Sequence, residues 1–238
     1  MGKRICALFL VLAVGITAAF ATVEVALNYS YLYSNNSTLS FDAESVVAYF
    51  GRNRLDRKVS SPLGVDGTIS LFFGNPQGLE LGIGMGASVD FFSNYKLEGI
   101  SLDVDSTAFD FSAVLGPALR VTFAKRHSFY LSPGIQFNYR KIEAKRKDEK
   151  EITYTMLEKN WAANLNMGYR LWLFSTPSLR AGLDAGLNLG IPLNSFNTFT
   201  KETGEIEDFK AQYKIKSGSL MKFYVGFCFN LGSASEKK

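Results

Sequence analysis

Two alternating segments joined by a short basic turn, within residues 108–139, constrain the fold of this chain most strongly. From Phe109 to Phe123, and again from Phe129 to Tyr139, most odd-numbered positions carry large apolar side chains. The even-numbered positions between them are mainly polar, charged or glycine. A period of two places each set on one face of a strand. One face stays apolar over roughly the ten residues that a tilted strand needs to cross a bilayer, so the stretch predicts a transmembrane β-hairpin.

The same alternation recurs along the chain and predicts eight strands. The expected strands are residues 23–33, 63–73, 79–91, 108–123, 129–139, 161–173, 179–191 and 219–231. Long connections at 34–62, 93–107, 141–160 and 192–218 alternate with short turns, as in bacterial outer-membrane barrels. A closed barrel also leaves no unpaired backbone edge in lipid. The sequence therefore predicts an all-β fold, an eight-stranded antiparallel up-and-down transmembrane β-barrel with extracellular loops and both termini in the periplasm.

The first residues predict export from the cytoplasm. Lys3 and Arg4 precede an apolar run over residues 5–20, and Ala19 and Ala21 form an Ala-x-Ala site. This is typical of a signal peptide cleaved after Ala21, and the run is short for a membrane-spanning anchor. We expect a signal peptide over 1–21, a barrel over 22–231 and a short tail over 232–238.

Charge and cysteine content exclude some classes of function. Without Lys3 and Arg4, the 26 basic residues fall to 24 against 22 acidic ones, which gives no indication of a nucleic-acid partner. Of the two cysteines, Cys6 lies in the predicted signal peptide and Cys228 in the last strand. An intrachain disulfide in the mature chain is therefore excluded.

The last strand carries a resemblance to outer-membrane proteins. Tyr224, Gly226, Phe229 and Leu231 fit a pattern of polar-x-Gly-x-x-aromatic-x-hydrophobic, which resembles the C-terminal assembly signal of that class. Over residues 22–231 the chain is similar in architecture to small OmpA/OmpX/OmpW-type barrels, although residues 232–238 extend past the usual end. The resemblance implies location in the bacterial outer membrane, contact with its lipid, and the barrel-assembly machinery as a partner.

The predicted inward face carries charges of both signs. These residues are Glu80, Asp90, Asp110, Arg120, Arg140, Arg170, Arg180, Asp184 and Lys222. They are either a selectivity lining or a buried network of ion pairs that fills the lumen. Eight strands leave an interior just wide enough for side chains, and buried charges need partners, so the mixed signs favour the network.

Two prolines interrupt the predicted hairpin. Pro117 and Pro133 each lie mid-strand on the lipid face, where each removes one donor from the hydrogen-bond ladder. One hypothesis is a weak seam that allows lateral exit of an apolar solute. The alternative, which we favour, is a bulge or kink that helps the barrel to close.

The sequence favours a non-enzymatic protein without metal or cofactor. Its single histidine, His127, lies in a turn assigned to the periplasmic side, whereas an enzyme acting on outer-leaflet lipid needs it at the other end. No cluster of histidine and cysteine predicts a metal site. Four basic loop residues suggest contact with lipopolysaccharide or a host polyanion, but a solvated face is the simpler interpretation: Arg52, Arg54, Arg57 and Lys58.

These observations lead to two functional hypotheses. The first is an integral outer-membrane protein with a structural or adhesive role, whose long charged loops meet host or surface ligands. The alternative is a narrow channel for small or hydrophobic solutes, similar to OmpW, suggested by the two prolines and the polar lumen.

Overall fold

The computed structural model describes most of the predicted barrel. The described residues are 21–41, 44, 51, 53–91, 94–97, 100–104, 109–146, 153–176, 178–202, 209–218 and 220–232. Nearly all of the predicted signal peptide and of the C-terminal tail lies outside these residues. No helix in the described part of the chain has the length and apolar character needed to span a membrane.

In the described part of the chain, eleven strands form one continuous sheet. They are β1 (Ala21–Phe41), β2 (Arg54–Gly74), β3 (Leu79–Phe91), β4 (Asn94–Leu97), β5 (Ile100–Val104), β6 (Phe109–Phe123), β7 (His127–Arg146), β8 (Thr153–Ser175), β9 (Leu179–Glu202), β10 (Phe209–Gly218) and β11 (Leu220–Leu231).

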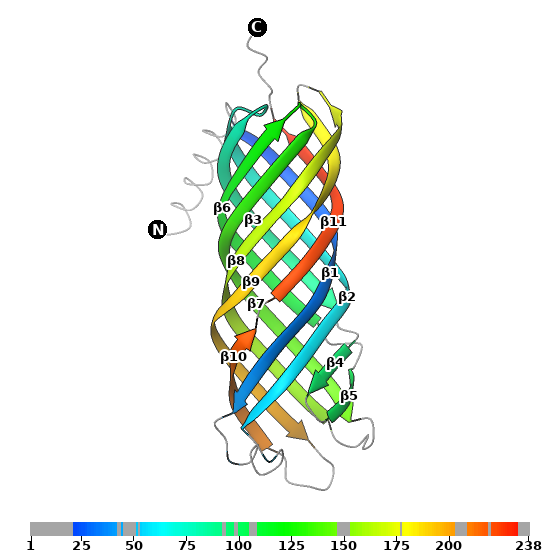
Figure 1. Cartoon of the computed structure of the whole chain (residues 1–238), viewed down its shortest axis with the longest axis vertical. Coiled ribbons are helices and arrows are strands. Elements are labelled where there is room, and N and C mark those ends of the chain that lie inside the picture. The colour runs from blue at the N-terminus through cyan, green and yellow to red at the C-terminus, as the bar shows by residue number, and fades with distance from the viewer. Residues whose placement is uncertain are drawn as a thin grey trace, which may run out of the picture.

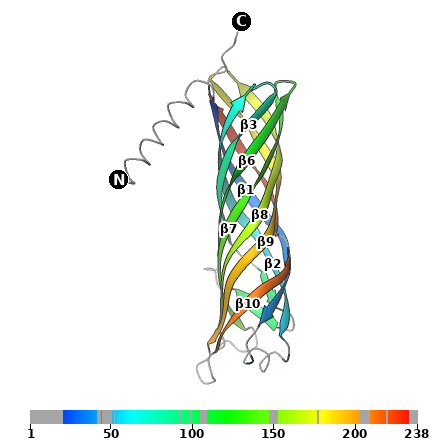
Figure 2. The ribbon, with the colours of Figure 1, turned by 90° about the vertical axis from the view of Figure 1, so that its left-hand side faces the viewer.

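The sheet closes on itself as an antiparallel barrel. Neighbours run β1–β2–β3–β6–β7–β8–β9–β11, and β11 pairs back with β1 from Val23↔Leu231 to Leu32↔Lys222. β10 continues the line of β11, so the two together make the eighth barrel strand (Figure 1). The predicted eight-stranded up-and-down barrel is confirmed. Short turns lie at one end of the barrel, called here the turn end, and the strand ends that the long connections join lie at the other, the loop end (Figure 2).

The middle of the barrel wall is apolar outside and polar inside, as the alternation predicts. Large apolar side chains that are at least half exposed on the outer face include Leu27, Leu81, Ile83, Leu115, Ile135, Leu173, Val225 and Phe227. Between them, the inward side chains of the same strands are mostly polar and buried. This outer band is the surface that faces lipid in a transmembrane barrel.

Most strands are longer at the loop end than the sequence indicated, so the predicted loop boundaries are wrong. β1 and β2 take up most of residues 34–62, β7 and β8 most of 141–160, and β9 and β10 most of 192–218. β8 has 23 residues. At about 3.3 Å per residue and a tilt of about 40°, it rises roughly 60 Å, about twice the height of an apolar band.

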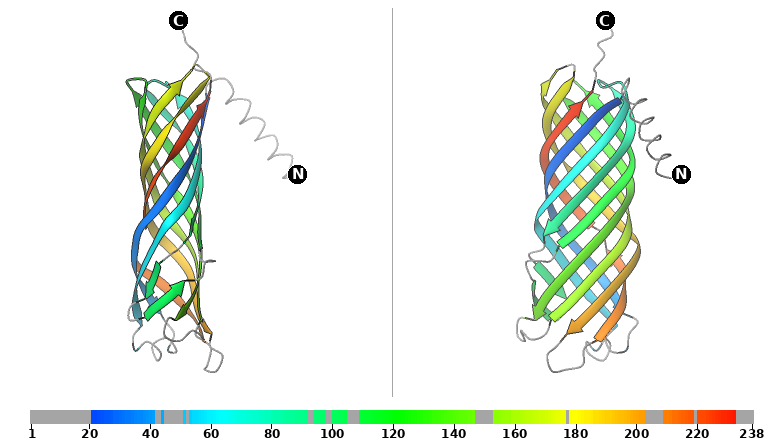
Figure 3. Two further views of the ribbon diagram at one scale, coloured as in Figure 1. Left: turned by 90° about the vertical axis from the view of Figure 1, so that its right-hand side faces the viewer. Right: turned by 180° about the vertical axis from the view of Figure 1, so that it is seen from behind.

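The second long connection also contains strands. At the loop end, β3 stops at Phe91 and β6 starts at Phe109, so neither reaches as far as the other strands. The short strands β4 and β5 take their place in the wall near the loop end (Figure 3). β4 pairs with β2 at residues 57–60, and β5 pairs with β7 at residues 144–146. The expectation of a simple loop over 93–107 was therefore wrong.

In the part of the strands that extends beyond the apolar band, the inward side chains are mainly apolar and the outward ones polar, the reverse of the transmembrane part. Inside this extension lies a set of buried, mainly apolar side chains that we call the outer apolar core: Leu39, Phe41, Leu55, Ile142, Tyr154, Met156, Ala211 and Tyr213. Outside it lie exposed polar side chains such as Arg54, Lys58, Lys145 and Lys210. This is the pattern of a water-exposed sheet around a dry core, so the extension stands outside the apolar band.

Candidate functional site

The lumen is the candidate functional site because it gathers nearly all the buried charge of the described residues. All nine charged residues predicted to face inward are buried, with exposed fractions of 7% or less. Burial of this kind requires partners. They separate into two groups along the barrel, one at the turn end and one towards the loop end.

The inner cluster, at the turn end, is built around two arginines. We define it as Glu24, Glu80, Arg120, Arg170 and Asp184. The Nε and Nη2 atoms of Arg120 lie 2.7 and 2.6 Å from Oε2 of Glu80, and Nη1 pairs with Glu24. Arg170 pairs with the other oxygen of Glu24 and, through Nε at 3.3 Å, with Asp184. Glu24 therefore bridges the two guanidinium groups.

Aromatic rings complete the surroundings of both arginines. The guanidinium carbon of Arg120 lies 4.4 Å from the ring centre of Phe72, and that of Arg170 lies 3.8 Å from the ring centre of Tyr130. Cation–π contacts of this kind are stronger where water is excluded. Arg180 lies beside this cluster, and its Nη1 donates to the backbone carbonyl of Pro76 at 3.0 Å.

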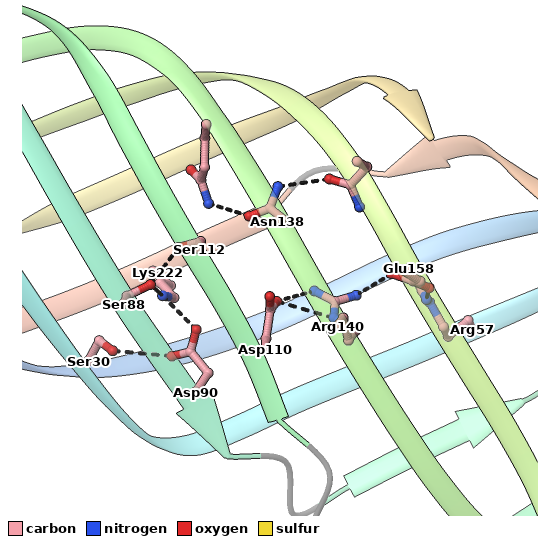
Figure 4. Close-up of polar contacts among 12 residues, drawn as sticks. Ser30, Arg57, Ser88, Asp90, Asp110, Ser112, Asn138, Arg140, Glu158 and Lys222 are labelled. Atoms are coloured by element: carbon pink, nitrogen blue, oxygen red, sulfur yellow. Dashed lines mark hydrogen bonds and ion pairs between the residues drawn. The ribbon is translucent and has the colours of Figure 1, made fainter. Parts of the chain in front are cut away.

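The outer cluster, towards the loop end, begins at Lys222. Its ammonium lies 2.6 Å from Asp90 and 3.3 Å from Asp66, and it donates to the hydroxyl of Ser88 at 2.7 Å. Ser30 donates to the other oxygen of Asp90 at 3.2 Å (Figure 4). Lys222 therefore has two carboxylate partners, of which Asp90 is fully buried and Asp66 is 16% exposed.

Two arginines complete the outer cluster, which comprises Asp66, Asp90 and Lys222 together with Arg57, Asp110, Arg140 and Glu158. Arg140 lies 2.7 Å from Asp110 and 3.1 Å from Glu158 (Figure 4). Arg57 pairs with the second oxygen of Glu158. The hydroxyl of Tyr213 also donates to Glu158 at 2.8 Å. Tyr213 belongs to the outer apolar core, so the charged layer and the dry core are in direct contact.

Uncharged polar side chains fill the level between the clusters. Asn138 donates to Asn160 at 2.8 Å, Asn164 donates to Asn188 at 2.7 Å, and Tyr224 donates to Asn166 at 2.7 Å. A cavity of about 30 Å³ lies here, lined in part by Asn28, Ser112 and Gln136. On this measure a water needs about 10–15 Å³, so the cavity has room for about two waters.

Four members of these clusters were absent from the predicted set: Glu24, Arg57, Asp66 and Glu158. Glu24 and Asp66 share the inward face of strands that were recognised, so their parity alone was a sufficient signal. Arg57 and Glu158 lie in segments taken for loops. The interpretation of Arg57 as part of a solvated face was wrong, because only 2% of it is exposed. Glu158 has the same even parity as the inward residues Asn160 and Asn164, a signal that extends into the supposed loop.

The residues of the assembly-signal pattern all lie on β11. Tyr224 points inward, whereas Phe229 and Leu231 are about half exposed on the lipid face. At Gly226, an added Cβ would lie 2.2 Å from the carbonyl oxygen of Leu27. This close approach of β1 and β11 requires glycine at that position.

Pro117 and Pro133 lie opposite each other across the β6–β7 seam. Pairing holds at Leu115↔Ile135 and Leu119↔Leu131, but the three pairs between them are missing. The register is the same on both sides, so no residue is inserted between these strands. Of the bulge or kink that the sequence favoured, the bulge is therefore absent from this seam. Both prolines lack the N–H that the central pair needs. Ser132 compensates in part, because its hydroxyl donates to the carbonyl of Pro117 at 2.9 Å.

His127 lies at the turn end, as expected from its place in the chain. Its Nδ1 makes a hydrogen bond with the hydroxyl of Tyr169, and its ring stacks on Phe123 with the centres 5.6 Å apart. The ring of Phe129 also stacks on Phe123, with the centres 5.5 Å apart. His127 is thus part of an aromatic group at the edge of the apolar band. Among the described residues, no group of three or more His, Cys, Asp or Glu side chains is arranged to hold a metal.

Comparison with known proteins rests on structure. No family model matches the sequence, and no curated protein matches it in sequence. The structure is similar to that of outer membrane protein OprG from Pseudomonas aeruginosa, with a TM-score of 0.59 and 10% identity, covering 90% of this chain and 97% of that one.

Two further solved structures show a weaker similarity. A major outer membrane protein from Thermus thermophilus has a TM-score of 0.47 and 10% identity, covering 89% of this chain and 99% of that one. AlkL has a TM-score of 0.46 and 14% identity, covering 92% and 94%. At these identities a similarity to solved structures shows fold alone, and the OprG comparison agrees with the closed sheet described above. The chain therefore has the fold of the small eight-stranded β-barrels of bacterial outer membranes.

Proposed function

We propose that this chain is a non-enzymatic protein of the bacterial outer membrane, whose closed barrel holds long extracellular loops in a structural or adhesive role. The observation that carries this proposal is the filling of the lumen by three successive layers. These are the inner cluster, the outer cluster and the outer apolar core. A solute passing along the barrel axis would have to separate all three.

The energetics of the charged layers support a closed lumen. Apart from Asp66, whose side chain is 16% exposed, each charge of the two clusters is almost completely removed from water, and the structure provides each with an opposite charge. Breaking a buried pair leaves an uncompensated charge, at about 3–5 kcal/mol. The clusters are therefore stable closures.

The extension of the strands supports a role at the surface. Six of the eight barrel strands continue past the apolar band and enclose the outer apolar core. The ends of these strands, from which the connections over 42–53, 147–152 and 203–208 leave, therefore stand well above the membrane. A protein that only anchored itself in lipid would not need a second core, above the level of the membrane.

Cysteine labelling tests the orientation that this proposal needs. Cys228 is fully buried, so a membrane-impermeant maleimide will react only with an added cysteine. We expect Lys210→Cys, on the outside of β10, to be labelled in intact cells. Lys125→Cys, in the β6–β7 turn, should be labelled only after the outer membrane is permeabilised. The reverse result would contradict the proposal.

A lateral route for small apolar solutes is the second candidate function, and two interruptions in the wall favour it. One is the seam at Pro117 and Pro133. For the other, the described residues show no strand pairing between 191–196 of β9 and 214–218 of β10, although the register is the same on both sides. A cavity of about 20 Å³ opens there beside Pro192, Ile215 and Leu220.

Uptake of an apolar tracer tests the proline seam as a lateral route. If Pro117→Val with Pro133→Val lowers uptake while the barrel stays folded, the lateral route is supported. Unchanged uptake in that double variant rules out the proline seam as the route.

A further inference from the structure

A group of aromatic and basic side chains lies on the outside of the barrel, where the apolar band ends at the loop end. We call it the outer aromatic–lysine patch and define it as Phe109, Tyr139, Lys141, Lys159 and Trp161. It covers three neighbouring strands, β6, β7 and β8. All five are odd-numbered and therefore share the outward face of these strands.

Strand pairing holds the members of the patch together. Tyr139 pairs with Lys159, and Lys141 pairs with Phe109. Lys141 and Lys159 are therefore diagonal neighbours on one face, with backbones about 7 Å apart. The ring centres of Phe109 and Tyr139 are 6.1 Å apart, and the ammonium of Lys159 lies 5.8 Å from the ring centre of Tyr139.

The aromatic members place the patch at the level of lipid headgroups. Trp161 is 49% exposed, and its ring meets Phe137 edge to face with the centres 5.3 Å apart. Tyrosine and tryptophan gather at the boundary between the apolar band and water. The two lysines lie on the side of this boundary that faces away from the band.

Both lysines retain capacity for an anionic ligand. Lys141 lies 2.6 Å from Glu143, but the two side chains are 41% and 34% exposed, and an exposed pair of this kind contributes about 0–1 kcal/mol. The hydrogen bond to Glu143 raises the pKa of Lys141, so this lysine stays charged at neutral pH. An ammonium has three N–H donors, and one partner leaves two of them for a ligand.

We propose that the outer aromatic–lysine patch binds the phosphorylated sugar headgroup of an outer-leaflet glycolipid, the lipid A part of lipopolysaccharide. Its phosphates contact Lys141 and Lys159, its sugar rings lie on Phe109 and Tyr139, and its acyl chains continue down the wall past Trp161. Three adjacent strands make the patch about 10 Å wide. That width suits a disaccharide with two phosphates better than the single phosphate of a phospholipid. The proposal rests on the proposed orientation, in which the loop end faces outward.

Native mass spectrometry of the folded protein, purified from outer membranes, tests the proposal. The probes are lipid A with both phosphates, lipid A with the phosphates removed, and phosphatidylglycerol. The variant is Lys141→Gln with Lys159→Gln. Its matched control is Lys58→Gln with Lys210→Gln, which removes the same charge from exposed positions on the opposite side of the barrel. The heat-modifiable gel shift confirms that each protein is folded.

We expect the wild-type chain and the control to bind phosphorylated lipid A about tenfold more tightly than the dephosphorylated form. The patch variant should lose this difference. Equal binding by the patch variant and the control would overturn the proposal, and so would binding of phosphatidylglycerol as tight as that of lipid A. Cysteine labelling separates a failure of the lipid A proposal from a failure of the proposed orientation, because it reports orientation whether or not lipid A binds.

Discussion

Glu24 is the residue on which the inner cluster depends, because its two carboxylate oxygens accept from two different arginines. One oxygen pairs with Arg120 and the other with Arg170, and Glu24 is 1% exposed. Glu80 and Asp184 each serve one of these arginines. The loss of Glu24 would therefore leave both guanidinium groups short of a partner in a dry environment.

We predict that Glu24→Gln lowers the free energy of unfolding by about 3 kcal/mol, since removal of one partner from a buried network leaves uncompensated charge. Urea unfolding in lipid vesicles measures the change. Trp172 reports on the cluster, because its ring centre lies 5.9 Å from the guanidinium carbon of Arg120. The control is Glu143→Gln, which removes a carboxylate from an exposed pair and should change stability by less than about 0.5 kcal/mol. Equal effects of the two variants would contradict the network.

The β6–β7 turn contains two non-glycine residues in the left-handed region, Ala124 with φ of 49° and Lys125 with φ of 60°. Both conformations favour glycine. We predict that Lys125→Gly stabilises the barrel by about 0.5–1 kcal/mol, measured by the same unfolding assay. Arg126→Gly is the control, because Arg126 lacks a positive φ and should gain nothing. A loss of stability in Lys125→Gly would show that the side chain, and not its backbone strain, matters there.

Among the elements, β7 and β8 show most clearly where the sequence was informative and where it was not. Their alternation is regular over the apolar band, and the strands were recognised there. Beyond it the same period continues with polarity reversed, so that Ile142, Tyr154 and Met156 point inward. The sequence criterion was an apolar outward face and a polar inward face. It cannot detect a strand whose inward face is apolar, so these segments were taken for charged loops.

Irregular strand pairing explains why other strand extensions, such as those of β1 and β2, were not recognised from the sequence. Along β1 and β2 the register shifts between Ser30 and Leu32 and again between Leu32 and Asn35. As a result, the inward face of β2 is even-numbered at Ser70 and odd-numbered at Leu55. A β-bulge inserts a residue into one strand, and nothing in a simple period of two predicts where it occurs. The charged lumen lies mostly before these shifts, which is why nine of its members were predictable from parity.

We predict that the extension around the outer apolar core can unfold while the membrane-spanning part of the barrel stays folded. Ile142→Ala, which removes buried volume from a side chain with 0% exposure, should destabilise the extension by about 2–4 kcal/mol. Limited proteolysis should then cut residues 141–160 faster, while the heat-modifiable shift of the barrel remains. Leu157→Ala, on the outward face opposite Lys141, is the matched control and should leave proteolysis unchanged. Loss of the gel shift in Ile142→Ala would show that extension and barrel fold as one unit.

At the scale of the whole molecule, a closed sheet surrounds charged side chains in its membrane-spanning part and apolar side chains in the extension. What fills the interior at each of these two levels follows from what surrounds the barrel there. In lipid the outer face must be apolar, so polar residues are confined to the lumen and satisfy one another. In water the outer face is polar, and the lumen can hold an ordinary hydrophobic core. Both solutions fill the interior.

Conductance across a planar bilayer tests the filled lumen most directly. The wild-type protein, refolded and confirmed as folded by its gel shift, should produce no discrete current steps, because the inner cluster, the outer cluster and the outer apolar core close the axis. Reproducible steps of fixed size from the folded protein would contradict this account, since they require a continuous aqueous path from one end of the barrel to the other.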